Sequence, residues 1–200
     1  MILKAIKSDS VKVAALHKET INEGFLSKLG VGFLSTLYSF RIKKELVLVY
    51  KEDNKVLGFV SCALSSQGIM KRFLFSSPGG ILKLMLVILQ NPKLIKSLLE
   101  TWRAPLLSAS DTNSNKEIPE TERLSISVSP LAQKGGIGTQ LLQALEDELK
   151  KKGVFNYKVI AGEKLEGANK FYLKNGFVLT KQINIHGNDV SNVYVKEICR

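Results

Sequence analysis

The feature that most constrains the fold is a glycine-rich turn between a strand and a helix. Apolar and polar residues alternate over 123–128, the strand ends before Pro130, and leucines recur at helical spacing over 138–152. The turn between them contains Gly135, Gly136 and Gly138. Such a turn aims backbone N–H groups at one point in front of a helix N-terminus, which favours binding of a phosphate. The alternative is a tight turn in which the glycines serve geometry alone.

The turn fits neither of two common nucleotide-binding motifs. It lacks the Gly-Lys-Ser/Thr ending of a Walker P-loop. Gly136 and Gly138 give the first half of the dinucleotide pattern, but Leu141 stands where a third glycine is required. These two motifs are therefore excluded, and the turn is either a phosphate site of another kind or a turn that needs its glycines for geometry alone.

The composition is that of a basic globular protein. The 200 residues include 29 Lys and Arg against 18 Asp and Glu, a net charge of +11. This balance attracts phosphorylated cofactors, nucleic acid or anionic lipid. The lysines are scattered and no base-stacking aromatic motif accompanies them, so nucleic-acid binding is not favoured.

Few residues suit metal or disulfide chemistry. Cys62 and Cys199 are too few for a disulfide framework, and His17 and His186 are too few for a metal cage. No metal site is expected, and no local motif supports a Cys-His nucleophilic pair.

No signal peptide is visible, and the longest apolar run, 81–89, is far shorter than the roughly 20 residues of a spanning helix. We expect a cytoplasmic protein.

The order of elements predicts an α/β fold in one domain, residues 1–200, with a mixed, twisted sheet of six to seven strands flanked by helices. Strands are expected at 2–6, 45–52, 55–64, 123–128, 155–161, 177–185 and 190–198, and helices at 11–22, 25–38, 138–152 and 166–175. Between the third and fourth strands a helical insertion occupies about 68–119. It contains helix candidates at 81–89 and 92–103 and a polar loop at 108–120.

Two motifs, in the correct order and separation, resemble the GNAT superfamily of N-acetyltransferases. The acetyl-CoA loop of that family reads Gln/Arg-x-x-Gly-x-Gly/Ala after a strand ending in Val-x-Pro, and 133–138 reads QKGGIG behind the VSP of 128–130. A later family segment reads Asn-x-x-Ala-x-x-Phe-Tyr-x-x-x-Gly-Phe, and 168–177 matches it from Ala onward. Leu165 replaces the usual Asn, which removes one polar contact near the cofactor arm. The resemblance covers about 122–198.

The resemblance implies a GNAT fold and acetyl-CoA as cosubstrate. Backbone groups of Ile126 and Val128 would bind the pantetheine arm, and the N–H groups of 134–139 would bind the pyrophosphate. The full set of expected cofactor-binding residues is Ile126, Ser127, Val128, Gln133, Lys134, Gly135, Gly136, Ile137, Gly138, Thr139, Ala168, Asn169, Phe171 and Tyr172.

The resemblance also implies catalytic roles. Tyr172 matches the usual general acid of the family, which protonates the departing thiolate. Its alternative role is to pack against the sheet with Phe171. Glu122, at the start of the strand before the turn, is the candidate general base, with a solvated surface role or a water relay as alternatives. Cys62 is expected to be structural rather than an acetyl carrier.

The acceptor follows less directly. The helical part of the insertion, about 68–103, carries mostly basic charge: Lys71, Arg72, Lys83, Lys93, Lys96 and Arg103 against Glu100. The resemblance implies direct acetyl transfer to a primary amine of a small acceptor, and the basic charge of the insertion leads to an amino sugar or a nucleotide-linked amino sugar as the hypothesis. Alternatives are a protein or peptide N-acetyltransferase and a non-catalytic acyl-CoA sensor or scaffold. The insertion helices would alternatively face a membrane surface, pack on the domain's own core or form a homodimer interface.

Overall fold

The computed structural model describes the chain except residues 22–25, 66–67, 77–117, 134, 187–188 and 200. Its seven strands form one sheet in the order β1-β2-β3-β4-β5-β7-β6. The strands are β1 (Ile2–Lys4), β2 (Leu46–Glu52), β3 (Lys55–Ala63), β4 (Glu122–Val128), β5 (Asn156–Gly162), β6 (Val178–His186) and β7 (Asp189–Glu197). All neighbours are antiparallel except β4 and β5, which are parallel. The predicted mixed sheet is thus confirmed, with seven strands.

The helices are α1 (Ser10–Thr20), α2 (Val31–Lys44), α3 (Ile69–Ser76), α6 (Ile137–Lys151) and α7 (Glu166–Lys174), with short 3-10 turns η1 (Lys7–Asp9), η2 (Leu26–Lys28) and η3 (Pro130–Ala132). Among the described residues, no helix has the length and apolar character needed to cross a membrane.

One helix departs from the sequence prediction. The expected helix over 25–38 is replaced by η2 and, after an extended Gly30, by α2, which runs on to Lys44. The helix continues because Phe40 and Arg41 are buried, so its inward face extends past the apolar stripe that the sequence displays. Of the insertion, α3 lies within the described residues, and the helix candidates at 81–89 and 92–103 lie outside them.

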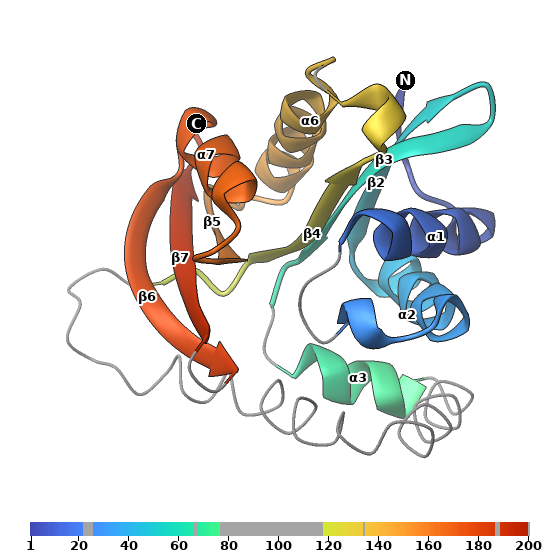
Figure 1. Ribbon diagram of the computed structural model, residues 1–200, viewed down its shortest axis with the longest axis horizontal. Coiled ribbons are helices and arrows are strands. Elements are labelled where there is room, and N and C mark those ends of the chain that lie inside the picture. Colours follow the sequence, from blue (N-terminus) through green and yellow to red (C-terminus); the bar gives the residue numbers. More distant parts are fainter. Residues whose placement is uncertain (22–25, 66–67, 77–117, 134, 187–188, 200) are drawn as a thin grey trace.

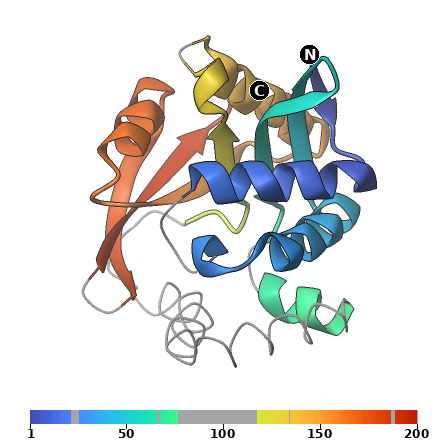
Figure 2. The same cartoon turned by 45° about the vertical axis from the view of Figure 1, so that its right-hand side comes forward.

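Helices cover both faces of the sheet, as Figure 1 shows. Along β3, Phe59 packs with α1 and α2, whereas Val60 and Cys62 pack with the leucines of α6. This alternation follows from the period of two in a strand. Figure 2 shows α1 lying across its face of the central strands. The two cores on opposite faces hold β4, and hence the predicted site, in a fixed position.

A buried histidine lies in the core under α1. His17 is 1% exposed, its Nδ1 lies 2.7 Å from the Tyr38 hydroxyl oxygen, and its ring stacks on Phe59. Burial, followed by the charges of Arg41 and Lys18, lowers the pKa of His17 from 6.5 to about 4. The side chain is therefore neutral at physiological pH.

This shift predicts a pH-dependent stability. Between pH 6.5 and about 4 the unfolded chain binds a proton at His17 that the folded chain does not. The free energy of unfolding is therefore unaffected by His17 above pH 6.5 and falls as the pH decreases below it. The slope should approach about 1.4 kcal/mol per pH unit. Urea unfolding between pH 7.5 and 5 measures it. His17→Gln should flatten the dependence, and His186→Gln, the matched control, should retain it. Equal slopes in the two variants would contradict the assignment.

Candidate active site

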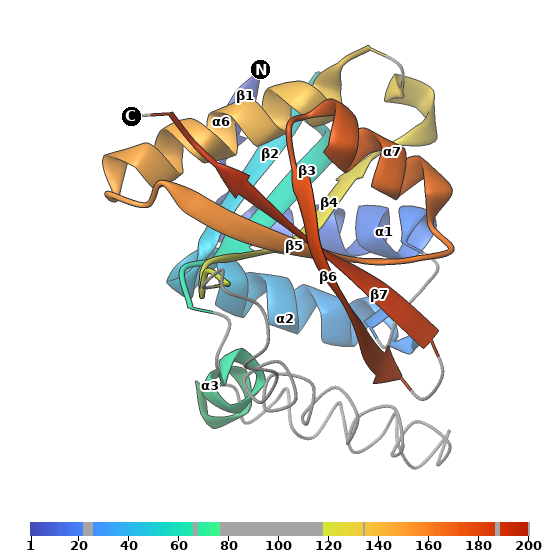
Figure 3. The same ribbon diagram turned by 90° about the vertical axis from the view of Figure 1, so that its left-hand side faces the viewer.

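The sheet opens between β4 and β5. These two strands pair only at Glu122 with Lys158 and at Arg123 with Val159. On its other edge, β4 stays paired with β3 as far as Val128. From residue 124 onward β4 and β5 therefore diverge, which Figure 3 shows from the side of β5. The divergence leaves one backbone edge of β4 facing a gap.

The backbone groups that face this gap can be identified from the register. The N–H of Ser129 donates to the carbonyl of Leu57 at 2.8 Å, so Ser129 and, two residues earlier, Ser127 direct their backbone groups toward β3. Ile126 and Val128, which alternate with these serines along the strand, direct their backbone groups toward the gap. A bulge opposite Ser61 and Cys62 sets this alternation for the second half of β4. This is the placement that the predicted pantetheine contacts require.

The glycine turn brings a helix N-terminus to the end of the same gap. Gly136 is the N-cap of α6 and has a left-handed backbone, with φ of 73°. No side chain caps the helix, and the first intrahelical bond from this cap runs from Gln140 N–H to the Gly136 carbonyl. The N–H groups of 137–139 therefore have no intrahelical acceptor. They carry the positive end of the helix dipole and suit a phosphate. Lys134 lies outside the described residues.

The second motif forms the opposite wall. A Cβ built on Gly138 would lie 3.2 and 3.3 Å from two carbons of the Phe171 ring, so α7 packs closely against the start of α6. Ala168 and Phe171 are partly buried against the α6 core. The two motifs that were recognised separately in the sequence are thus in contact.

Tyr172 lies where the two strands begin to diverge. Its hydroxyl oxygen accepts a hydrogen bond from the Arg123 guanidinium, whose carbon lies 4.7 Å from the centre of the tyrosine ring. Both side chains are 4% exposed. A guanidinium has no acceptor, so the phenol hydrogen cannot be given to Arg123. Among the described residues, the Tyr172 hydroxyl donates no hydrogen bond. Its hydrogen is therefore not engaged by another described group.

Arg123 is the residue that the sequence analysis missed. No ion pair joins it to a carboxylate among the described residues, and its Nε has no hydrogen-bond partner there. A buried cation without a counter-charge is costly to fold. In an alternating strand directly after Glu122, an arginine gives no signal of burial, so the sequence could not single it out.

Three further predicted residues have partners within the protein. The carboxylate of Glu122 lies 3.8 Å from Lys158 Nζ, and both side chains are partly buried. The Ser127 hydroxyl donates to Thr20 Oγ1 at 2.5 Å, which ties the end of α1 to β4. The Gln133 amide donates to the Val128 carbonyl at 3.2 Å. Base catalysis by Glu122 would have to compete with the Lys158 ammonium.

Asn169 connects α7 to the end of β5. Its amide nitrogen donates to the carbonyls of Gly162 and Glu163 at 3.1 and 2.9 Å. Its oxygen accepts from Asn192 and Tyr194 at 3.2 and 3.0 Å. All of these contacts are within the protein, so the side chain holds α7 at the edge of the gap.

Cys62 is unsuited to carry an acetyl group. It is buried in the α6 core, and burial raises the pKa of its thiol to about 12. The thiolate, which is the nucleophile, is therefore scarce at neutral pH. Within the described residues, no group of three or more His, Cys, Asp or Glu side chains suits a metal ion.

Comparisons with known proteins agree with this geometry. The family model of the acetyltransferase (GNAT) domain matches residues 107–179. No protein of curated function matches the sequence. The fold is similar to that of an N-acetyltransferase from Staphylococcus aureus Mu50, with a TM-score of 0.62 and 18% identity over 98% of this chain and 97% of that one.

Two further similar structures hold a coenzyme. PaiA N-acetyltransferase from Thermoplasma acidophilum, in complex with coenzyme A, has a TM-score of 0.58 and 15% identity over 98% of both chains. YncA of Salmonella typhimurium, described as an acetyltransferase with its cofactor acetyl-CoA, has a TM-score of 0.59 and 16% identity over 100% of this chain and 94% of that one. At these identities the likenesses establish the fold alone.

The family model assigns residues 107–179 to the acetyltransferase domain of the GNAT superfamily. The chain as a whole has a GNAT-like fold.

Proposed function

We propose that this enzyme moves the acetyl group of acetyl-CoA to a primary amine of a small acceptor, directly and in a complex that holds both substrates. The observation that carries the proposal is the divergence of β4 and β5 beside the uncapped N-terminus of α6. A thioester arm fits along the free edge of β4, and its pyrophosphate fits the N–H groups at the start of α6.

The cosubstrate contacts follow from this arrangement. Ile126 and Val128 offer backbone groups to the pantetheine amides, and 137–139 offer N–H donors to the pyrophosphate. When bound, acetyl-CoA supplies an activated acetyl carbonyl. Phe171 and Ala168 would form an apolar wall beside the arm.

The chemistry needs a proton donor for the thiolate. The acceptor nitrogen forms a bond to the acetyl carbon, the carbon–sulfur bond breaks, and the thiolate takes a proton from the Tyr172 hydroxyl. The positive charge of Arg123 lies beside the tyrosine oxygen and stabilises the negative charge left there. The acceptor amine loses its proton to Glu122 or to water. A phenol with a free hydrogen favours this enzymatic role over a non-catalytic acyl-CoA sensor.

For the acceptor, we propose an amino sugar or a nucleotide-linked amino sugar. The support is the net charge of +11 together with the basic residues of the insertion. The test is release of free CoA thiol across amino-sugar nucleotides, free amino sugars, polyamines and peptides. Turnover of the sugars supports the proposal, and activity only on polyamines or peptides overturns it.

The cosubstrate site is tested by a matched pair of glycines on α6. Gly136 at its start and Gly153 just past its end have φ of 73° and 72°. Substitution by Ala should cost about 1–2 kcal/mol of stability at either position, because both backbones are left-handed. Only Gly136→Ala should weaken acetyl-CoA binding, which we expect to be tenfold or more by calorimetry. Equal affinities of the two variants would contradict a phosphate site at this turn.

A further inference from the structure

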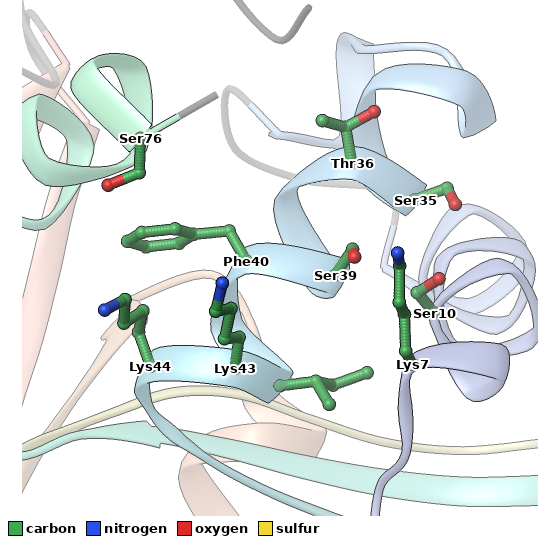
Figure 4. A pocket seen from close by; sticks show the side chains of 10 residues that line it. Lys7, Ser10, Ser35, Thr36, Ser39, Phe40, Lys43, Lys44 and Ser76 are labelled. Carbon is green, nitrogen blue, oxygen red and sulfur yellow. The ribbon is translucent and has the colours of Figure 1, made fainter. Parts of the chain in front are cut away.

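A basic pocket lies on the side of α2 that faces away from the sheet. Figure 4 shows its lining, and its volume is about 810 Å³. Lys7 and Ser10 line it from η1 and the start of α1, Ser39, Lys43 and Lys44 from α2, and Ser76 from the end of α3. Neither the glycine turn nor the gap between β4 and β5 contributes a residue.

The pocket has cations and no counter-charge. None of its ten lining residues is Asp or Glu. The two carboxylates closest to these lysines in the sequence bind other cations. Asp9 lies 2.7 Å from Lys51 Nζ, and Glu45 lies 3.1 Å from Arg72 Nη2. No ion pair to Lys7, Lys43 or Lys44 is found within the described residues.

The helix dipole of α2 explains why some of these lysines are present. Lys43 and Lys44 occupy the last turn of α2, where cations stabilise the helix dipole. Lys7 has no such role. It lies across the pocket from them, with its ammonium directed toward Ser39 and Ser10 (Figure 4). Ser10 is only 6% exposed, and it nevertheless lines the pocket. The three lysines are solvent-exposed and line one pocket together with hydroxyl side chains, so an anion bound there gains attraction from all three ammonium groups.

The donor set indicates the class of anion. Lysine ammoniums are point charges rather than the planar fork that matches a carboxylate. The Ser39 side chain lies between Lys43 and Lys7, the Ser10 side chain lies beside Lys7, and both hydroxyls add neutral donors. A phosphate has enough oxygens to accept from several such donors at once. We propose that this pocket binds a phosphate-bearing ligand, at a second anion site distinct from the turn before α6.

The test is a calorimetric titration with inorganic pyrophosphate at low salt. Because pyrophosphate also suits the glycine turn, the titration is run on the protein alone and on protein saturated with CoA. We expect a binding event that persists with CoA present. The triple variant Lys7→Gln, Lys43→Gln, Lys44→Gln should weaken that event at least tenfold. Equal affinity of wild type and this variant, with and without CoA, overturns the proposal.

A charge-matched control separates a built pocket from general attraction. The variant Lys55→Gln, Lys152→Gln, Lys174→Gln removes the same net charge from exposed lysines elsewhere. It should bind pyrophosphate within about twofold of wild type, and a loss equal to that of the pocket variant also overturns the proposal. Thermal unfolding of both variants verifies that they fold. The pocket comparison does not depend on acetyl transfer, so it stands even if CoA fails to bind.

The source of the phosphate is a separate arm of the same experiment. Co-sedimentation with vesicles of phosphatidic acid, against vesicles of phosphatidylcholine, tests a lipid headgroup. Pocket-dependent binding to pyrophosphate alone assigns a soluble ligand, and pocket-dependent binding to the anionic vesicles as well assigns a headgroup. Binding to neither overturns the site.

Discussion

Tyr172→Phe should lower kcat by about 100- to 10,000-fold, the usual contribution of a general acid. The variant removes the hydroxyl oxygen that accepts the Arg123 bond and leaves the ring that packs against Phe177 and Tyr194. The affinity for acetyl-CoA should stay within about threefold, because the proposed cosubstrate contacts come from backbone groups of β4 and α6. Stopped-flow or steady-state release of the CoA thiol, combined with calorimetry, measures the two quantities separately.

A second buried tyrosine provides the control. Tyr157 packs on Phe177 in the same core, and its hydroxyl donates to Glu146 at 2.8 Å. Tyr157→Phe deletes a hydrogen-bonded phenol oxygen from this core without touching the gap, so it should lose stability and retain kcat. If both variants lose turnover equally, the effect of Tyr172→Phe is structural and the acid assignment is wrong.

The parts of the site that are local in sequence could be predicted from it. The turn at 133–138, the helix that follows and the motif at 168–177 each depend on spacing within a few residues. Their neighbours along the chain determine their conformation, so α6 and α7 lie within a residue or two of the expected bounds. The hairpin of β2 and β3 could likewise be predicted from the sequence, because Asp53 and Asn54 form a two-residue turn with positive φ.

The rest depends on contacts between residues far apart in the sequence. Arg123 meets Tyr172 across 49 residues, and Ser127 meets Thr20 across 107. Nothing in a strand pattern indicates which charged residue will be buried by a helix that follows much later. The pocket on α2 was missed for the same reason, because it forms only when the start of α1 and the end of α3 come together beside that helix.

Arg123→Met is the second variant with a large expected effect. Methionine has a similar length and no charge, so the variant leaves the Tyr172 oxygen without its donor. We expect kcat to fall about 100-fold, the typical cost of removing one preorganised donor at a reacting centre. The melting temperature should not fall, because replacing a buried cation that lacks a carboxylate with an apolar side chain is often neutral or stabilising. A purely structural arginine would show the opposite pattern, with lower stability and retained turnover.

Arg41 is the matched control for this variant. It is also buried, at 5% exposed, and its guanidinium carbon lies 5.3 Å from the ring centre of Tyr38 on the other face of the sheet. Because the charge of Arg41 reaches Glu122 but not the Tyr172 hydroxyl, Arg41→Met should lower kcat far less than Arg123→Met does. Arg123→Lys retains the cation as a single point charge, so part of the lost turnover should return.

A double variant then decides whether Arg123 acts through Tyr172. If Arg123 serves to hold and polarise the phenol, it has nothing left to act on once the hydroxyl is gone. Arg123→Met combined with Tyr172→Phe should then be no slower than Tyr172→Phe alone. A further 100-fold loss in the double variant would mean that the guanidinium acts on the reacting groups independently, because independent contributions multiply. The coupling therefore separates a positioning arginine from one that contacts the substrate, and it does so from rates alone.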